Sequence, residues 1–277
     1  MIKKKIGFWS IIVHIIMFAL ALFWLYPYIW MLSASLKSTA TIMTTNFWQG
    51  PFSFENYQFI IESSERVHMS FLRSLGNSIL VTAVATIFVV LFSSIVAYAF
   101  CKMEFKGRSF LNKLVIFQMV FPTFMFMVPQ FILMRSLHLL NTYSALFLPY
   151  VLSIGGIFMI SQSFRSTPND YIEAAKIDGA TDLWIVFKLM MPLNKAIITI
   201  VALNVFVGVW NDFMWAMIVT SDYDKMTLAV LLATFFKQYG NYMGPLMAGS
   251  TILTLPMLIG FFIFRKRLFE GMNLSLK

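Results

Sequence analysis

Charged residues are scarce in this chain. Only 12% of its 277 residues are Asp, Glu, Lys or Arg, whereas 59% are hydrophobic and the mean hydropathy is +0.78. A soluble domain ordinarily carries about 25% charged residues, so a soluble protein of this length could not cover its apolar surface. The composition therefore predicts an integral membrane protein with lipid as its solvent.

Cysteine, histidine and the common catalytic motifs are also lacking. The chain has one cysteine, Cys101, and three histidines, which exclude a disulfide framework and a Cys-rich metal site. It contains no GxxxxGK[ST] phosphate loop, no HExxH and no GxSxG, so no ATP site of the P-loop type is expected. We therefore expect a protein that is not an enzyme, with no catalytic residue, no metal and no cofactor of its own.

Six apolar runs are long enough to cross a bilayer, which takes about 20 helical residues. The first run is much longer than the apolar core of a signal peptide, so it is interpreted as an uncleaved span. Continuous runs of this length indicate helices rather than barrel strands. The predicted fold is an all-α integral membrane protein in which 1–277 forms one transmembrane domain. The six predicted spans are 8–32, 76–100, 110–134, 143–163, 193–219 and 245–264.

The net charge of +9 is distributed as short basic clusters between the apolar runs, which favours membrane topology over nucleic-acid binding. With the N-terminus inside, fifteen of the 21 Lys and Arg residues fall in inner segments. The remaining six are in outer segments: Lys37, Arg66, Arg73, Arg135, Lys225 and Lys237. This asymmetry predicts that both termini face the cytoplasm, with 36–74 as an outer loop and 164–192 inside.

The inner segment 164–192 carries its own helix signals. Thr167 is placed to cap a short helix and Gly179 to end it in a left-handed conformation. Thr181 is placed to cap a second helix, and Pro192 opens the fifth span. The segment is therefore predicted to be structured rather than a simple linker.

Small side chains on the first of these helices suggest a docking role. Ala174 and Ala175 would let the helix lie deep in a groove of a partner protein, with Tyr171 and Ile177 as flanking apolar anchors. Glu173 offers an acceptor to a donor of that partner. A docked helix of this kind can pass a movement rigidly to the spans on either side.

The pattern Glu173-Ala174-Ala175 followed by Asp178-Gly179-Ala180 resembles the coupling-loop signature of bacterial ABC importer permeases. The resemblance covers roughly residues 28–271 and is closest to the carbohydrate-uptake permeases, as the six-span member of the maltose, multiple-sugar and glycerol-phosphate type of permease pair. Further matching motifs are Asn77-Ser78, Ala97-Tyr98-Ala99, Phe105-Lys106-Gly107-Arg108, Trp210-Asn211-Asp212-Phe213, Thr227-Leu228 and Pro256.

The resemblance implies a type I ABC importer fold in the bacterial cytoplasmic (inner) membrane. It implies as partners a second permease subunit, two ATPase subunits that bind ATP and Mg, and an extracytoplasmic solute-binding protein. Phe269 and Gly271 are implied as contacts of the tail with the ATPase. The residues implied in ATPase coupling are Tyr171, Glu173, Ala174, Ala175, Asp178, Gly179 and Ala180.

A candidate substrate pathway is formed by Gln118 in the third run and by the trio Trp210, Asn211 and Asp212 in the fifth. Asp212 is the only carboxylate within an apolar run, and the trio could hydrogen-bond to a sugar and stack on it. The alternative is that Asp212 caps or braces a helix break.

The expected function is import of a sugar or oligosaccharide, with a glycerol phosphate or another polyol as the alternative substrate. No basic residue lies in the middle of a span, which favours a neutral sugar. An ion-coupled secondary transporter is disfavoured because such proteins place charged relays at mid-membrane, where this chain has almost no charge. No catalytic constellation supports a membrane enzyme.

Overall fold

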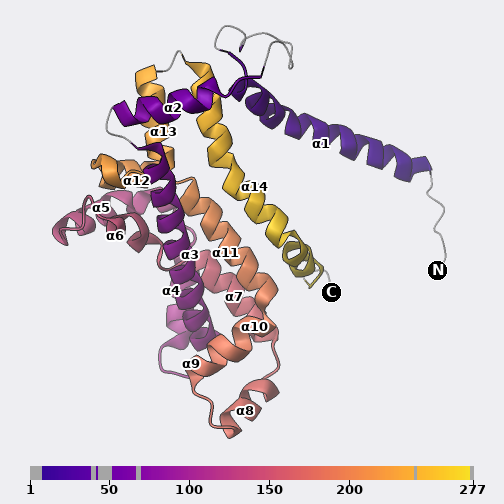
Figure 1. The fold of residues 1–277 in the computed structure, drawn as a ribbon. Coiled ribbons are helices and arrows are strands. Elements are labelled where there is room, and N and C mark those ends of the chain that lie inside the picture. Colours follow the sequence, from indigo (N-terminus) through magenta and orange to yellow (C-terminus); the bar gives the residue numbers. More distant parts are fainter. Residues whose placement is uncertain (1–7, 39–41, 43–51, 67–69, 240–241, 275–277) are drawn as a thin grey trace. The chain divides into compact units, whose positions relative to one another are not determined.

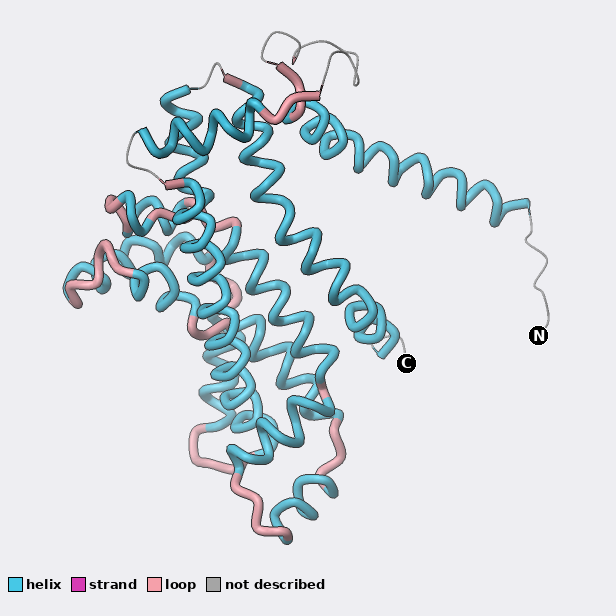
Figure 2. Tube along the Cα trace, in the orientation of Figure 1, coloured by secondary structure: helices cyan, strands magenta, loops and turns pink. Residues whose placement is uncertain are grey.

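A computed structural model of the chain describes residues 8–38, 42, 52–66, 70–239 and 242–274. These residues form helices and connecting loops, with no strand among them (Figures 1 and 2). The predicted all-α class is confirmed. The α-helices are α1 (Phe8–Ser35), α2 (Glu55–Arg66), α3 (Phe71–Lys102), α4 (Arg108–Gln118), α5 (Met127–Ser136), α6 (Tyr143–Phe147), α7 (Ile154–Ser166), α8 (Asp170–Ile177), α9 (Asp182–Trp184), α10 (Met191–Leu193), α11 (Lys195–Trp210), α12 (Met214–Val219), α13 (Leu228–Tyr239) and α14 (Met243–Leu274).

Four shorter or wider helical turns complete the described elements. They are the 3-10 turns η1 (Thr123–Phe126), η2 (Leu148–Tyr150) and η4 (Tyr223–Lys225), and the π-helix η3 (Ile185–Met190). The predicted outer loop 36–74 is therefore partly helical, since α2 lies within it.

The chain divides into two compact units, 1–67 with 232–255 and 68–231 with 256–277. In the first unit, the buried Asn56 donates hydrogen bonds from Nδ2 to the carbonyls of Ser35 and Lys37, at 2.9 and 2.7 Å. A Cβ on Gly249 would approach Leu232 Cδ2 to 2.3 Å, so this glycine permits close helix packing. Asn56 thus joins α2 to the C-terminal end of α1, and Gly249 lets α13 and α14 approach closely.

In the second unit, α3 packs along α7 and α11 (Figure 1). Small residues make this approach possible, as in many membrane helix pairs. Ser93 and Ala97 of α3 are fully buried, and a Cβ on Gly156 of α7 would meet Val201 Cγ1 at 3.1 Å. Elements α8 and α9 lie toward one end of α3, and α5, α6 and α12 lie toward the other.

Two apolar clusters lie along α3. The Trp215 cluster includes Val81, Ala85, Leu146, Trp215 and Val219, and the Tyr98 cluster includes Ala97, Tyr98, Phe164, Ile172 and Ile185. Within a bilayer, helices associate mainly through van der Waals packing and interhelical hydrogen bonds rather than through exclusion of water. The clusters therefore hold both ends of α3 to the elements around it.

Three helices are long and apolar enough to cross a membrane singly: 8–35, 71–102 and 243–266. They contain the whole of the predicted spans 8–32, 76–100 and 245–264. The other three candidates are bent pairs, 108–118 with 123–136, 143–150 with 154–166, and 182–193 with 195–210, bent by 103°, 44° and 92°. If each pair is one span, the helices account for six crossings.

The expectation of continuous helices over 110–134, 143–163 and 193–219 is wrong. The first is broken before Thr123, where Pro122 has no backbone N–H to continue α4. The second is interrupted after Tyr150, and the third ends at Trp210 before α12 begins at Met214. Hydropathy identifies apolar runs but does not detect such breaks, which neighbouring helices and side chains stabilise.

Candidate functional site

The 164–192 segment folds as two short helical stretches joined by a glycine turn. α8 ends at Ile177, and Gly179 has φ +83°, a left-handed conformation that favours glycine. Thr181 Oγ1 then accepts a hydrogen bond from the backbone N–H of Trp184 at 3.3 Å. The predicted glycine stop and the predicted Thr181 cap are both confirmed.

The predicted cap at Thr167 is wrong. α8 begins at Asp170, two residues later than expected, with Asn169 before it and no side-chain cap. Thr167 instead ends α7, and its Oγ1 accepts a hydrogen bond from Asn194 Nδ2 at 3.1 Å. A contact with a residue far along the chain therefore replaces the expected local one.

One face of α8 is buried and the other is open. Ile172 is only 6% exposed and packs in the Tyr98 cluster, with Ala175 and Ala180 packed against it. Tyr171 is 53% exposed and Ile177 is 87% exposed. The implied coupling residues Glu173, Ala174, Asp178 and Gly179 are exposed too. The open face thus combines apolar anchors, small side chains and the carboxylates of Glu173 and Asp178, which suits a protein groove.

The C-terminal end of α3 fastens this segment. The Tyr98 hydroxyl donates to Asp182 Oδ1 at 2.9 Å, and Lys102 Nζ donates to the Thr167 carbonyl and to Asn169 Oδ1, each at 2.7 Å. These bonds lie on both sides of α8 in the sequence. The exposed face is therefore presented on a fixed platform.

A further bond set fastens the segment to α7 and α11. Asn194 lies at the 92° bend between α10 and α11, where its Oδ1 accepts from Ser163 Oγ at 2.6 Å. Its Nδ2 donates to Thr167 Oγ1 and to the Met190 carbonyl, at 3.1 and 2.8 Å. These bonds connect the 164–192 segment to α7 and to the start of α11.

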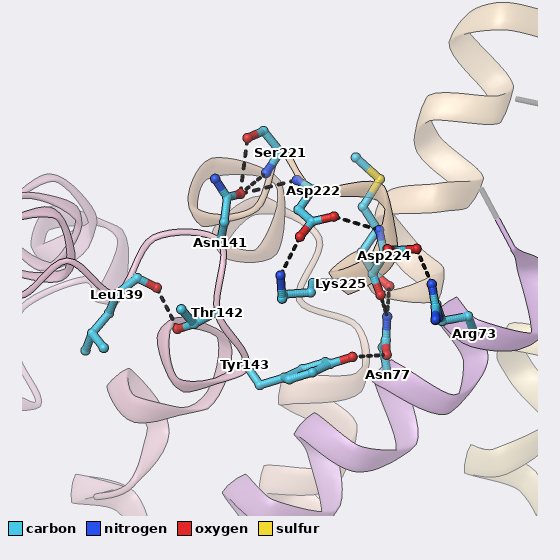
Figure 3. A network of polar contacts seen from close by, with 11 residues as sticks. Arg73, Asn77, Leu139, Asn141, Thr142, Tyr143, Ser221, Asp222, Asp224 and Lys225 are labelled. Carbon is cyan, nitrogen blue, oxygen red and sulfur yellow. Dashed lines mark hydrogen bonds and ion pairs between the residues drawn. The ribbon is translucent and has the colours of Figure 1, made fainter. Parts of the chain in front are cut away.

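A polar network fastens the other end of α3 (Figure 3). The buried Asn77 donates from Nδ2 to the carbonyls of Asp224 and Met226, both at 2.9 Å, and accepts from the Tyr143 hydroxyl at 2.9 Å. Arg73 forms an exposed ion pair with Asp224. These contacts tie α3 to the 222–226 turn and to α6.

The turn before α6 joins the same network. Asn141 has φ +60°, and its Oδ1 accepts hydrogen bonds from Ser221 N, Ser221 Oγ and Asp222 N, at 2.7, 3.1 and 3.2 Å (Figure 3). Lys225 pairs with Asp222, and this hydrogen bond lowers the pKa of the Asp222 carboxyl and raises that of the Lys225 ammonium. Asn77 belongs to a motif noted in the sequence, but its partners were not anticipated, because they lie 66–149 residues away along the chain.

An open cavity of about 870 Å³ lies beside the helix breaks. Gln118 and Asp212 of the predicted pathway line it. The Tyr150 hydroxyl donates to Asp212 Oδ2, and the Trp215 backbone N–H donates to Asp212 Oδ1 at 3.0 Å. Asp212 thus caps α12 at a break, the alternative role considered for it, and also borders the cavity.

The other two members of the predicted pathway lie elsewhere. Trp210 is buried and stacks on Phe206 with ring centroids 5.8 Å apart. Asn211 donates to the Val207 carbonyl and contacts Met257 Sδ. Neither lines this cavity. Tyr150 and Trp215 border it instead. Pro149 could have pointed to Tyr150 in the sequence, because a proline within an apolar run is a potential helix breaker.

Comparison with known proteins identifies the family. The family described as binding-protein-dependent transport system inner membrane component matches residues 89–272. The chain belongs to this family. It is a permease subunit of an ABC importer and a multi-pass protein of the cytoplasmic membrane, as the resemblance implied.

Individual permeases support this assignment over most of the chain. The arabinooligosaccharides transport system permease protein AraQ of Bacillus subtilis is 31% identical over 92% of this chain and 91% of its own length. The trehalose/maltose transport system permease protein MalG of Thermococcus litoralis is 32% identical over 92% of this chain and 91% of its length. A solved bacterial ABC transporter that imports the acidic polysaccharide alginate is similar in structure, with TM-score 0.78, 25% identity and coverage of 97% and 99%.

The predicted tail contacts are only partly within the described structure. Phe269 and Gly271 lie in α14, which extends to Leu274, and the final residues 275–277 lie outside the described part. The implied role of this tail in the permease stays a prediction.

Proposed function

We propose that this permease forms half of the translocation pathway for a sugar or oligosaccharide, and that separate ATPase subunits drive it by docking against α8. The observation that carries the proposal is the open face of α8 on a platform fastened by Tyr98, Lys102 and Asn194. Permeases named for arabinooligosaccharides and for trehalose/maltose, similar over most of the chain, support the substrate class.

The proposed assembly contains this chain, a second permease subunit, two ATPase subunits that carry ATP and Mg, and an extracytoplasmic solute-binding protein. Both termini and the 164–192 segment face the cytoplasm in this arrangement, and the tail around Phe269 and Gly271 reaches the ATPases. Family membership and the uneven distribution of basic residues support it.

In the proposed coupling step, the ATPase grips Tyr171 and Ile177 as apolar anchors and approaches the backbone over Ala174. Glu173 accepts a hydrogen bond or an ion pair from the ATPase. Closure of the two ATPases moves α8, and the bonds from Tyr98 and Asn194 carry the movement to α3, α7 and α11. The chain itself contributes no catalytic group to ATP hydrolysis.

Charge reversal on α8 tests this proposal. Glu173→Lys in the assembled transporter is expected to reduce ATP-dependent sugar uptake by at least about tenfold, because a tenfold effect needs only ~1.4 kcal/mol at the docking surface. Glu104→Lys is the matched control, since Glu104 is also exposed but lies in the loop between α3 and α4. Both variants must insert in the membrane to wild-type amounts.

Two results would overturn the proposal. One is wild-type uptake in Glu173→Lys, which would remove α8 from coupling. The other comes from a tagged pull-down in mild detergent. Reproducible recovery of the folded chain without a P-loop ATPase would mean that the protein works alone, as an ion-coupled secondary transporter would.

A further inference from the structure

Three interrupted helices meet at the cavity beside Asp212. Its lining includes Gln118 and Thr123 from the break between α4 and η1, Tyr150 and Ser153 from the break between η2 and α7, and Asp212 from the break between α11 and α12. Irregular backbone at membrane depth is stable only where it is buried in protein or lines a water-filled cavity. Substrate sites of transporters are often built from such discontinuous helices. The shared location of the three breaks therefore marks this cavity as a candidate binding site.

The polar groups of the cavity suit hydroxyl groups. Both Asp212 oxygens are oriented by Tyr150 and Trp215, and a carboxylate retains further lone pairs for donors from a ligand. The side-chain amides of Gln118 and Gln130 line the same space, and neither forms a hydrogen bond to another described residue. A carboxamide can donate and accept at once, as a sugar hydroxyl can. The cavity thus offers three separate polar groups for a ring bearing several hydroxyls.

The remaining lining suits the apolar face of a sugar ring. Phe121, Phe124 and Trp215 contribute aromatic surface, and Trp215 is held in place because its Nε1 donates to the Ala145 carbonyl at 2.9 Å. The volume of about 870 Å³ is within the range of ordinary small-molecule sites. A site that combines apolar surface with a few placed polar groups is typical of small-ligand recognition.

The charge of the lining selects against anions. Among the described residues that line the cavity, Asp212 is the only one with a charged side chain, and none is Lys, Arg or His. A carboxylate or phosphate on the ligand would lie beside the Asp212 carboxylate without a cationic partner, and the repulsion of the like charges is costly. This chain therefore lacks what an acidic sugar or a glycerol phosphate would need here.

We infer that this cavity binds a neutral sugar ring of the transported substrate, through Gln118, Gln130 and Asp212. The inference rests on the proposed function and deepens it, because it assigns a substrate subsite to this permease itself. The Asp212–Tyr150 pair has two roles in this site: it stabilises the helix break and it orients the acceptor that meets the sugar.

Thiol protection tests the site directly. Cys101 is the only cysteine of the chain, so Cys101→Ser gives a background in which Gln118→Cys carries its single thiol. The whole transporter in proteoliposomes is treated with a maleimide, with maltose, trehalose or arabinobiose as the neutral probe. We expect the transported sugar to slow labelling at position 118 by at least about fivefold. Gln162→Cys is the control, because Gln162 is exposed on α7 and does not line the cavity.

Gln130→Cys provides a second site should the first variant fail to assemble. Uptake is measured in parallel: Gln118→Leu and Gln130→Leu are expected to lower the maximal uptake rate several-fold, and Gln162→Leu to leave it within about twofold. A glucuronate disaccharide and glycerol 3-phosphate are expected to give no protection.

Each alternative outcome identifies what fails. If the wild-type transporter shows no ATP-dependent uptake of any sugar, the proposed function fails. If uptake is intact but the transported sugar protects neither introduced thiol, the subsite is wrong while the function stands. Protection by a short-chain phospholipid and not by sugar would make the cavity a lipid site, and equal protection by the acidic disaccharide would refute the preference for neutral sugars.

Discussion

The hydroxyl of Tyr98 donates to Asp182 Oδ1 at 2.9 Å, and this bond joins the C-terminal part of α3 to the first residue of α9, 84 positions later. Tyr98 is buried, whereas the Asp182 side chain is about half exposed and also pairs with Lys176 at 3.5 Å. The contact thus connects the protein interior to the surface segment that we propose as the ATPase dock. Its loss should affect coupling more than folding.

Tyr98→Phe is therefore expected to uncouple the transporter while leaving it assembled. The variant removes one hydrogen bond to a carboxylate, worth about 1–2 kcal/mol after solvent screening of Asp182. We expect sugar uptake per ATP hydrolysed to fall at least about twofold, with a thermal midpoint lower by a few °C. The check is paired measurement of uptake and ATPase rates in proteoliposomes. Tyr28→Phe, on the exposed surface of α1, is the control. Equal behaviour of the two variants would contradict the prediction.

Gly179→Ala is expected to destabilise the turn after α8. No atom lies within 4 Å of an added Cβ, so the cost comes from φ +83° alone, about 1–2 kcal/mol for an L-residue. We expect faster hydrogen exchange across 170–184 and reduced uptake. Gly76→Ala is the matched control, because its Cβ also meets nothing within 4 Å and its φ is not positive. Slower or unchanged exchange in the Gly179 variant would show that the turn is not strained by a side chain.

Local sequence signals predicted the glycine turn and the second helix cap of the 164–192 segment, whereas its long-range contacts were missed. Gly179 and Thr181 act within a few residues of their own positions, so turn and cap rules identify them. Thr167 does not cap α8. Its hydroxyl oxygen instead accepts a hydrogen bond from Asn194, 27 residues later. Such a competitor is invisible until the fold brings α7 and α11 together.

The lining of the cavity was also only partly predictable from the sequence. Asp212 and Gln118 stood out in the sequence because they are polar residues in apolar runs. Trp210 stood out because it lies two residues from Asp212, yet it is buried and stacks on Phe206. Trp210 is the last residue of α11, whereas Asp212 follows the end of that helix, so the two side chains have different surroundings. The residues that border the cavity with Asp212 come from other helices, and only the breaks in those helices place them there.

At the opposite end of α3, a buried amide should matter more than an exposed ion pair. Asn77 is 5% exposed and makes three hydrogen bonds, so Asn77→Leu leaves two carbonyls and the Tyr143 hydroxyl without their partner, at a cost of about 2–4 kcal/mol. Arg73→Gln removes only an exposed pair with Asp224, worth about 0–1 kcal/mol. Thermal unfolding of the purified transporter and hydrogen exchange of 222–228 measure the difference. A larger effect from Arg73→Gln would mean that the surface charges, and not the buried amide, hold this turn.

The Asp222–Lys225 pair should make the 220–226 turn sensitive to pH only at the extremes. The hydrogen bond from Lys225 holds the pKa of Asp222 below its ordinary value of about 3.9, so its stabilising contribution is present above that value and is lost as the pH falls through the lowered pKa. The raised pKa of Lys225 has the opposite sign: its contribution is present below its ordinary pKa of about 10.4 and is lost as the pH rises through the raised value. We therefore expect no change in the turn between about pH 5 and 9.

Carbon-13 NMR of labelled Asp in the transporter measures the titration of Asp222, and Lys225→Gln should move that pKa upward. An unchanged Asp222 pKa in this variant would show that Lys225 does not set it.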